Sequence, residues 1–299
     1  MNKRQNNGRG LEYAFGKAIS RILKVRVDGD RGRIREEAFG SLNPKTKRYF
    51  EADAREMIVH ILALEGIDAG VGGWSAKFIE DSFAREGDVR DIVLRRRGVE
   101  LGISCKSNHR AFRHSRISPI SSIRSAWRLG KDSLESPAYL VSLNRAFAEV
   151  ESPKPKSWSD LGEERKRVFY NRCIRVFGEE LRRLAAIDEA TFSRNFFRYV
   201  MGSKGYYKCV VSERFSFLQG FLFGRSVVAR INCPKRLVKM DFPSDKSGVL
   251  HLYFDRGISF SLRLHNASDS YERSLKFDIQ AIGLPQSLYT HHLVRRLKR

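Results

Sequence analysis

The residues best suited to chemistry lie between Asp88 and Arg116, in the stretch DVRDIVLRRRGVELGISCKSNHRAFRHSR. Asp88 and Asp91 precede a short apolar run, and Lys106 lies at the end of a second one. If the two runs pair as a hairpin, their far ends bring Asp91 and Lys106 together. A carboxylate and a lysine placed there can hold a divalent cation and direct a water molecule at a phosphodiester. The spacing therefore favours metal-dependent phosphodiester chemistry.

The second acid that such a site needs is not where it would be expected. Alternation along the strand puts Ser104 on the same face as Lys106, two positions before it. A metal-binding carboxylate would ordinarily stand there, and a hydroxyl is a poor ligand for a hard dication. Another acid must then compensate. We expect Glu12 to be the helper, with Glu51 and Glu100 as alternatives.

Polar and basic residues that could bind phosphate or bases follow Lys106 directly. They are Asn108, His109, Arg110, Arg113, His114 and Arg116. The whole chain has 56 Lys and Arg against 34 Asp and Glu, a formal charge of +22. An excess of this size indicates a polyanionic partner, most often nucleic acid, although a generally basic protein is the plain alternative. The two histidines lack nearby thiolates or further histidines, so DNA contacts are favoured over zinc.

Hydrophobic periodicity predicts an α+β protein with helices early and strands late. Residues 1–10 are expected to be frayed and 27–47 to be turn-rich, while the segment after Trp74 is either a short helix or an irregular strand. The expected helices are 11–25, 48–65, one beginning near Ser136, 160–187 and an aromatic segment ending before Gly202. From Tyr206 the period changes to two, which indicates strands. Three parts are expected: 1–150, a basic helical region 151–205 and a β-rich region 206–299.

The cysteine pattern and the hydropathy of the chain indicate in which cellular compartment the protein is expected. Four cysteines are scattered without a C-x-x-C pair, so neither a zinc site nor a disulfide framework is expected. The first residues, MNKRQNNGRG, contain no apolar segment of the kind found in secretory signals. No run approaches the length of a membrane span. We therefore expect a cytoplasmic protein with no membrane partner.

Several blocks of the chain resemble a known family. They are GRGLEY, GDVRDIV, GISCKSNHRAFRHSRIS and SFSLRLHNASDSYERSLKFDIQAIGLP, spread from Gly8 to Pro285. The hairpin resembles the PD-(D/E)XK nuclease core with Ser104 in the (D/E) place. The blocks together resemble the HaeIII family of type II restriction endonucleases. The resemblance implies a restriction-endonuclease-like core, with a central mixed sheet flanked by helices in 1–150 and a β-rich DNA-binding or clamp region in 206–299.

The resemblance also implies roles for single residues. Asp91, with Asp88 as a second candidate, would match the metal-binding acid, and Lys106 the catalytic lysine. Asn108, His109 and His114 would belong to the active-site mouth. With Glu12 as the helper acid and Ser104 beside it, these residues form the expected catalytic set. Arg110, Arg113 and Arg116 would hold the DNA backbone, and Arg263, His265, Asn266 and Lys276 offer a second surface for DNA.

The implied activity is Mg²⁺-dependent cleavage of both strands of duplex DNA at a short palindrome, GGCC in that family, leaving 5′-phosphates. A palindromic target suggests a homodimer, and a cognate DNA methyltransferase would be the genetic partner. Two other readings stay open. One is a different PD-(D/E)XK nuclease, acting in repair or on DNA structures. The other is a non-enzymatic sequence-specific DNA-binding protein, although no helix-turn-helix signature supports it.

Overall fold

The structure is a computed structural model of the 299-residue chain. It describes residues 3–29, 32–80, 88–108, 111, 112, 115–120, 123, 127, 129, 136–222, 231–244 and 247–293. Two compact units are present, each made of segments that are not consecutive in the chain. The first unit comprises Met1–Arg110, Gly202–Ile231 and Gln286–Arg299. The second comprises Ala111–Met201 and Asn232–Pro285.

Three helices of the first unit come from the N-terminal part of the chain: α1 (Lys3–Leu23), α2 (Gly32–Gly40) and α3 (Pro44–Leu64). The expectation that residues 1–10 are frayed is wrong from residue 3 onward, because α1 begins there. Gly10 gives the reason, since a Cβ at this position would lie 2.7 Å from Cδ1 of Leu42. At Gly10 the helix thus packs closely against Leu42, a contact that leaves no local sequence signal. The turn-rich reading of 27–47 also missed α2.

Helix α3 begins four residues before the expected position 48. The side chain of Asn43 accepts a hydrogen bond from the amide of Thr46 at 2.8 Å, and Pro44 occupies the first turn. Both residues are favoured there because the first amides of a helix lack internal acceptors. The helix ends before Gly66, whose φ of +64° is a conformation that glycine adopts without strain.

The first unit contains a seven-stranded mixed sheet with the order β1-β2-β3-β4-β6-β7-β12. The β1–β2 and β4–β6 pairs are parallel and the others are antiparallel. The segment after Trp74 is strand β2, which decides the alternative left open above. The strands are β1 (Val27–Asp28), β2 (Ser75–Phe78), β3 (Ile92–Arg96), β4 (Val99–Ser107), β6 (Tyr206–Val211), β7 (Ser216–Phe221) and β12 (Thr290–Leu293).

The predicted hairpin is strands β3 and β4. They are joined by Arg97 and Gly98, with φ values of +42° and +81°. Two consecutive positive φ angles are typical of the tight turns that match the twist of antiparallel strands. The register pairs Ile92 with Ile103 and Leu94 with Leu101, so the alternation read from the sequence places the side chains correctly.

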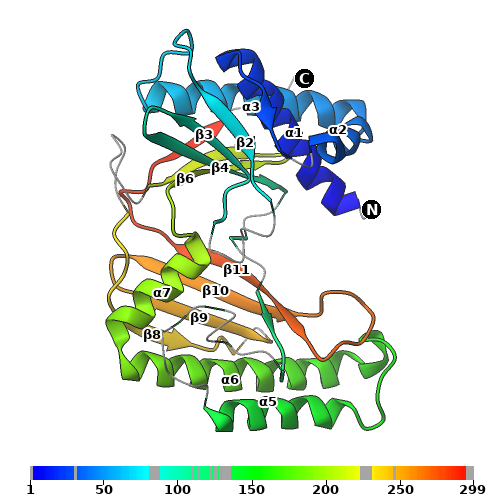
Figure 1. Ribbon diagram of the computed structural model, residues 1–299. Helices are drawn as coiled ribbons and strands as arrows, with labels where there is room; N and C mark the ends of the chain where they lie inside the picture. Colours follow the sequence, from blue (N-terminus) through cyan, green and yellow to red (C-terminus); the bar gives the residue numbers. More distant parts are fainter. Residues whose placement is uncertain are drawn as a thin grey trace. The chain divides into compact units, whose positions relative to one another are not determined.

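Helices α1 and α3 lie along one face of this sheet (Figure 1). The core between them is aliphatic and aromatic, and burying each large side chain contributes about 1.5–3 kcal/mol. This packing fixes α1, and therefore Glu12, against β4. The core includes Leu11, Phe15 and Ile19 of α1, Phe50, Met57 and Ile61 of α3, and Leu94, Ile103 and Tyr207 of the sheet.

Strand β12 is attached to α3 through a pair of histidines. The His60 ring stacks on the His291 ring with centroids 4.0 Å apart, and His60 Nε2 also contacts the Tyr289 hydroxyl. Burial and the neighbouring His291 lower the pKa of His60, and Glu56 only partly offsets this. The folded protein therefore favours neutral His60 more strongly than the unfolded chain does.

Acidification should loosen this attachment. Because the pKa of His60 is lower in the folded state, its contribution to stability is present above the unfolded pKa of about 6.5 and is lost as the pH falls through the folded value. Urea unfolding at pH 7.5 and pH 5.5 should show a smaller loss of stability in His60→Gln than in the parent. Equal losses of stability in the two proteins would show that His60 is not the source of this pH dependence.

The second unit is built on a five-stranded antiparallel sheet with the order β5-β11-β10-β9-β8. Trp127 lies at its core, in ring contact with Phe177, Phe196 and Phe277 at centroid distances of 5.0, 6.0 and 5.4 Å. The elements are β5 (Arg116–Ile117), α5 (Pro137–Val150), the short 3-10 helix η2 (Ser159–Leu161), α6 (Glu163–Ile187), α7 (Glu189–Met201), β8 (Leu237–Asp241), β9 (Val249–Phe254), β10 (Ile258–His265) and β11 (Leu275–Gly283).

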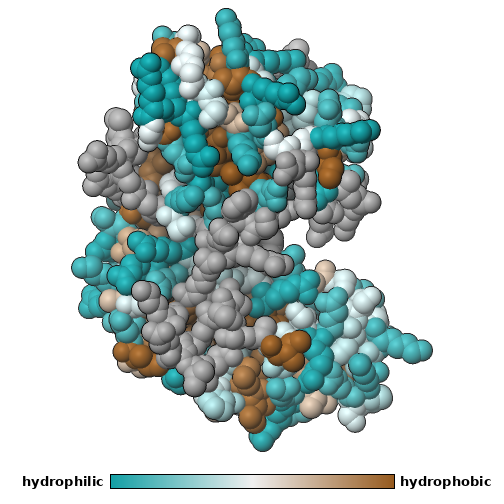
Figure 2. All heavy atoms as spheres, viewed as in Figure 1, coloured by the Kyte–Doolittle hydropathy of each residue, from teal (hydrophilic) through white to brown (hydrophobic). Residues whose placement is uncertain are grey.

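The predicted fold class is confirmed: the chain is α+β, with a mixed sheet flanked by helices and a β-rich C-terminal region. Strands β6, β7 and β12 of that region belong to the first sheet. The division of the chain into three functional parts, 1–150, 151–205 and 206–299, remains a prediction. Among the described residues, no helix has the length and apolarity required to cross a membrane. In Figure 2 the described surface is mainly hydrophilic, with small separate hydrophobic patches.

Candidate active site

The hairpin brings Asp91 and Lys106 together. Asp91 stands directly before β3, where its amide donates to the carbonyl of Ile103 at 2.8 Å and its own carbonyl accepts from Ile79 at 2.9 Å. Lys106 lies near the end of β4. Its Nζ is 3.6 Å from Oδ2 of Asp91, and the two side chains are 19% and 22% exposed. The convergence expected from the spacing is therefore present, and both side chains are partly exposed.

The Asp91 carboxylate is held in one orientation by the facing strand. Its Oδ2 accepts a hydrogen bond from the amide of Cys105 at 2.6 Å and another from the Ser104 hydroxyl at 3.2 Å. Ser104 is buried, so its hydroxyl acts inside the sheet rather than at the surface. In this structure Ser104 orients the acid, a contact that a carboxylate at the same place could not make without repulsion.

Glu12 supplies a second carboxylate from α1. Burial and the Asp91 charge raise its pKa to about 7, while Arg35 and Lys106 act in the opposite direction. These effects require Glu12, Asp91 and Lys106 to be close enough to interact electrostatically. Of the three acids considered as helpers, the structure brings Glu12 into this cluster.

Arg35 holds Glu12 in place and was not found by sequence reasoning. Its Nε donates to Oε2 of Glu12 at 2.6 Å, and its Nη2 donates to the carbonyl of Ile79 at 3.3 Å. The guanidinium also lies over the Phe78 ring, 4.5 Å from the centroid. Arg35 stands in an arginine-rich stretch with no pattern that singles it out. Only its burial, with 6% exposure, distinguishes it.

The other acids have different partners. Glu51 pairs with Lys17 at 2.5 Å, and Glu100 accepts from Arg90 and Arg95. Asp88 forms a two-pronged pair with Arg90, with N–O distances of 2.7 and 2.6 Å. Burial acts to raise the pKa of Asp88, but its bonds to Arg90 lower it overall. These contacts place Asp88 in an ion-pair cluster around Arg90 and disfavour it as a metal ligand.

Comparison with known proteins assigns the chain to a family. The model of the HaeIII restriction endonuclease family matches residues 8–285. The chain belongs to the HaeIII restriction endonuclease family. Type II restriction enzyme HaeIII of Haemophilus aegyptius is 27% identical over 311 residues, covering 96% of each chain. No solved structure matches the chain. This HaeIII-family protein is a type II site-specific deoxyribonuclease.

Type II restriction endonucleases generally use divalent metal ions. Among the described residues of this HaeIII-family chain, no group of three or more His, Cys, Asp or Glu side chains could hold a metal. Burial is the main cause of the raised pKa of Glu12, and the negative charge of the neighbouring Asp91 carboxylate raises it further. A cation between them would relieve that repulsion, and carboxylate oxygens are the ligands that hard dications prefer. Asp91 and Glu12 are therefore the described residues that would hold such an ion.

The predicted DNA-binding residues of the HaeIII-family chain fall into three groups. His109, Arg110, Arg113 and His114 lie outside the described residues. Asn108 follows the last residue of β4 with a φ of +62°, and its amide donates to the carbonyl of Val211 at 3.0 Å. The remaining candidates, Arg116, Arg263, His265 and Asn266, lie in the second unit.

Among the candidates that the structure describes, Asn266 has both ends of its side-chain amide bonded within the protein. Its Oδ1 accepts from the Tyr170 hydroxyl at 3.2 Å, and its Nδ2 donates to the carbonyl of Ser268 at 2.7 Å. These bonds are those of an asparagine that stabilises a turn. In contrast, Arg263 is exposed on β10.

Proposed function

We propose that this restriction endonuclease hydrolyses both strands of duplex DNA at a short palindromic site, with GGCC as the expected sequence, and leaves 5′-phosphates. The observation that carries the proposal is the 3.6 Å approach of Lys106 Nζ to Asp91 Oδ2, with Glu12 electrostatically coupled to both. A lysine beside paired carboxylates is suited to a phosphodiester, because it places positive charge where negative charge develops.

Each residue of the cluster has a distinct role in this proposal. Asp91 and Glu12 would hold Mg²⁺, which would supply polarisation of the scissile phosphate and a more acidic bound water. Burial acts to lower the pKa of Lys106, but Asp91 and neighbouring groups raise it overall, so the ammonium stays charged. It can then stabilise the phosphorane charge or orient the water. Ser104 and Arg35 orient the two carboxylates.

The arrangement supports assigning the first unit to the PD-(D/E)XK class, with Asp91 as the acid and Ser104-Cys105-Lys106 in place of the (D/E)-x-K segment. Asp88 stays a second candidate for the acid, although Arg90 occupies it. Asn108, Arg116, Arg263 and His265 are proposed to contact DNA, as are His109, Arg110, Arg113 and His114. We further propose a homodimer, because a palindrome offers one equivalent strand to each active site.

A cytoplasmic location and a cognate methyltransferase complete the proposal. An enzyme that cuts a short sequence threatens its host chromosome, so a methyltransferase that modifies the same sequence is expected beside it. The 27% identity to HaeIII spans 96% of both chains, which supports transfer of the reaction more strongly than transfer of the exact recognition sequence.

Plasmid digestion tests this proposal. With Mg²⁺ the full-length protein should convert plasmid DNA into discrete fragments, and EDTA should stop the reaction because the carboxylate pair would lose its cation. Sequencing the fragment ends then gives the recognition sequence and the cut position, and direct ligation reports 5′-phosphates.

Two results would contradict the proposal. A smear on duplex DNA, or cutting only at branched or damaged DNA, would favour a structure-specific or repair nuclease. Binding to duplex DNA without any cleavage under Mg²⁺ or other dications would favour a non-enzymatic DNA-binding protein.

A further inference from the structure

The sheet of the second unit has two chemically different faces. One face is apolar, with Leu262, Leu264, Phe277 and Ile279 all buried. The α7 residue Phe196 contacts Phe254 and Phe260 there, and the α6 residue Phe177 contacts Phe277. Strand alternation directs the intervening residues to the opposite side. Those residues are almost all polar.

We call this second side the polar sheet face and define it by Arg116, Arg263, His265, Lys276, Asp278 and Gln280. The register places them next to one another. Arg263 is opposite Asp278, His265 is opposite Lys276, and Lys276 is opposite Arg116. Opposite residues in an antiparallel pair have Cβ atoms about 4.5–5.5 Å apart. The face is therefore a continuous set of hydrogen-bonding groups with more cations than carboxylates.

Arg263 and Asp278 are neighbours of opposite charge that do not pair. Arg263 is exposed and has neither a hydrogen bond nor an ion pair with another described residue. The Asp278 carboxylate instead accepts a hydrogen bond from Gln280, whose Nε2 lies 2.8 Å from its Oδ2. A fork of donors and an oriented acceptor thus stand side by side, and each has capacity for an external partner.

The cations of the same face are crowded. Burial and the neighbouring Arg116 lower the pKa of Lys276, and Asp278 only partly offsets this. Arg116 in turn bonds to Glu272 at 3.0 Å and to Ser274 at 3.4 Å. Like charges held together in this way are relieved by an anion such as a phosphate.

We infer that Arg263 and Asp278 read one G·C base pair of the target site through the major groove. The guanidinium donates to O6 and N7 of guanine, and the carboxylate accepts from the N4 amino group of cytosine. Lys276 and Arg116 contact the flanking phosphates, which set position but carry no sequence information. The inference rests on the proposed function. It assigns recognition of the base pair to the second unit and cleavage to the Asp91–Lys106 cluster of the first unit.

The test combines protein variants with an altered base. The cut site is first established with the parent enzyme by sequencing fragment ends. Cleavage, as kcat/KM, is then measured on short duplexes that carry this site with 7-deazaguanine at single positions, which removes the N7 acceptor. Arg263→Ala should lower kcat/KM on the normal site by about tenfold or more, the value of one two-pronged base contact.

The decisive result is non-additivity. At one guanine, and at the symmetry-related guanine of the other half-site, 7-deazaguanine should lower kcat/KM of the parent several-fold. The same replacement should not lower kcat/KM of Arg263→Ala any further. Arg263→Lys, which keeps the charge but not the fork, should behave like the alanine variant. Asp278→Ala should lose preference at the same base pair.

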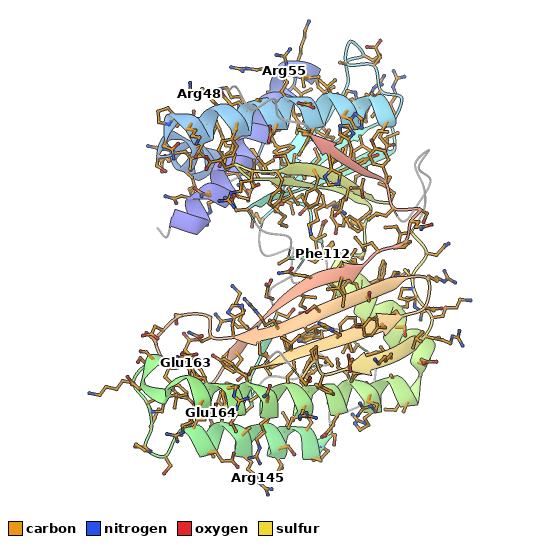
Figure 3. All side chains as sticks on the ribbon, turned by 180° about the vertical axis from the view of Figure 1, so that it is seen from behind. Arg48, Arg55, Phe112, Arg145, Glu163 and Glu164 are labelled. Atoms are coloured by element: carbon orange, nitrogen blue, oxygen red, sulfur yellow. The ribbon has the colours of Figure 1, made fainter. Side chains whose placement is uncertain are left out.

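Arg145→Ala is the matched control. Arg145 lies on the outer side of α5, pointing away from the sheet, and its loss removes the same charge from the same unit (Figure 3). It should leave every rate unchanged. Thermal melting of the Arg263 and Arg145 variants should match the parent, since both arginines are exposed.

Two outcomes overturn the inference while leaving the proposed function intact. In one, Arg263→Ala cuts the normal site as fast as the parent. In the other, 7-deazaguanine impairs parent and variant equally at every position, so that Arg263 acts on the backbone alone. If the parent yields no discrete fragments, the proposed function fails first, and the inference fails with it.

Discussion

Asp91→Asn should lower the rate of DNA cleavage by on the order of a thousandfold, because it removes half of the carboxylate pair that fits a divalent cation. Asparagine has the same shape, so the amide of Cys105 and the Ser104 hydroxyl keep an oxygen to bond with. The variant should therefore fold normally and still bind DNA. Single-turnover plasmid cleavage in Mg²⁺, with a gel-shift assay for binding, measures both properties.

Lys106→Ala should likewise fold and bind DNA, and its rate of DNA cleavage should fall by about a hundredfold or more. Two controls come from the same unit. Asp28→Asn changes an aspartate whose side chain is 71% exposed, and Lys77→Ala changes an exposed lysine of β2. Both controls should cut at the parental rate. If Asp91→Asn or Lys106→Ala also did so, the assigned active site would be wrong.

The second large effect concerns stability. Arg90→Ala should lower the free energy of unfolding by about 3–5 kcal/mol, because it leaves the Asp88 carboxylate, with a side chain 10% exposed, without its two-pronged partner. The backbone amide of residue 90, 3.2 Å from Oδ1 of Asp88, and the longer 3.6 Å contact with Lys204 would remain, but the charged two-pronged partner would be lost. Urea unfolding followed by circular dichroism measures the loss.

Arg95→Ala is the matched comparison, since both arginines bond to Glu100. The Arg90 side chain is 1% exposed and that of Arg95 is 53% exposed. Solvent screens the exposed pair, so its removal should cost less than about 1 kcal/mol. Equal losses in the two variants would show that burial is not what makes the Arg90 cluster important.

Local pattern was enough to predict the hairpin and the meeting of Asp91 with Lys106. Two apolar runs separated by a turn allow one register that buries their hydrophobic residues, and that register fixes which ends converge. Glu12 was ranked first among the helpers, and it is the acid found near Asp91. These successes depend on periodicity and on residue chemistry, both of which are visible in a single chain.

What escaped prediction depends on contacts between distant segments. Arg35 and Arg90 are buried arginines that look like surface residues in the sequence. Gly102 likewise has no local explanation, but a Cβ there would lie 2.1 Å from Cδ of Arg90. Of the strands from Tyr206 onward, β7, β8 and β12 were missed, whereas β6, β9, β10 and β11 were recognised from their period of two. Their partition between two sheets was not, because pairing partners far apart in sequence leave no periodic signal.

The order of strands in the first sheet has a consequence for biosynthesis. Strand β4 ends at Ser107, its parallel neighbour β6 begins at Tyr206, and β12, which pairs with β7, begins only at Thr290. A ribosome releases the chain from its N-terminus, so Lys106 emerges long before the strand that will flank it. Until β12 arrives, β7 exposes an open edge able to pair with a foreign strand. The first sheet of the nascent nuclease thus stays incomplete, and vulnerable to misassembly, until Thr290–Leu293 has been synthesised.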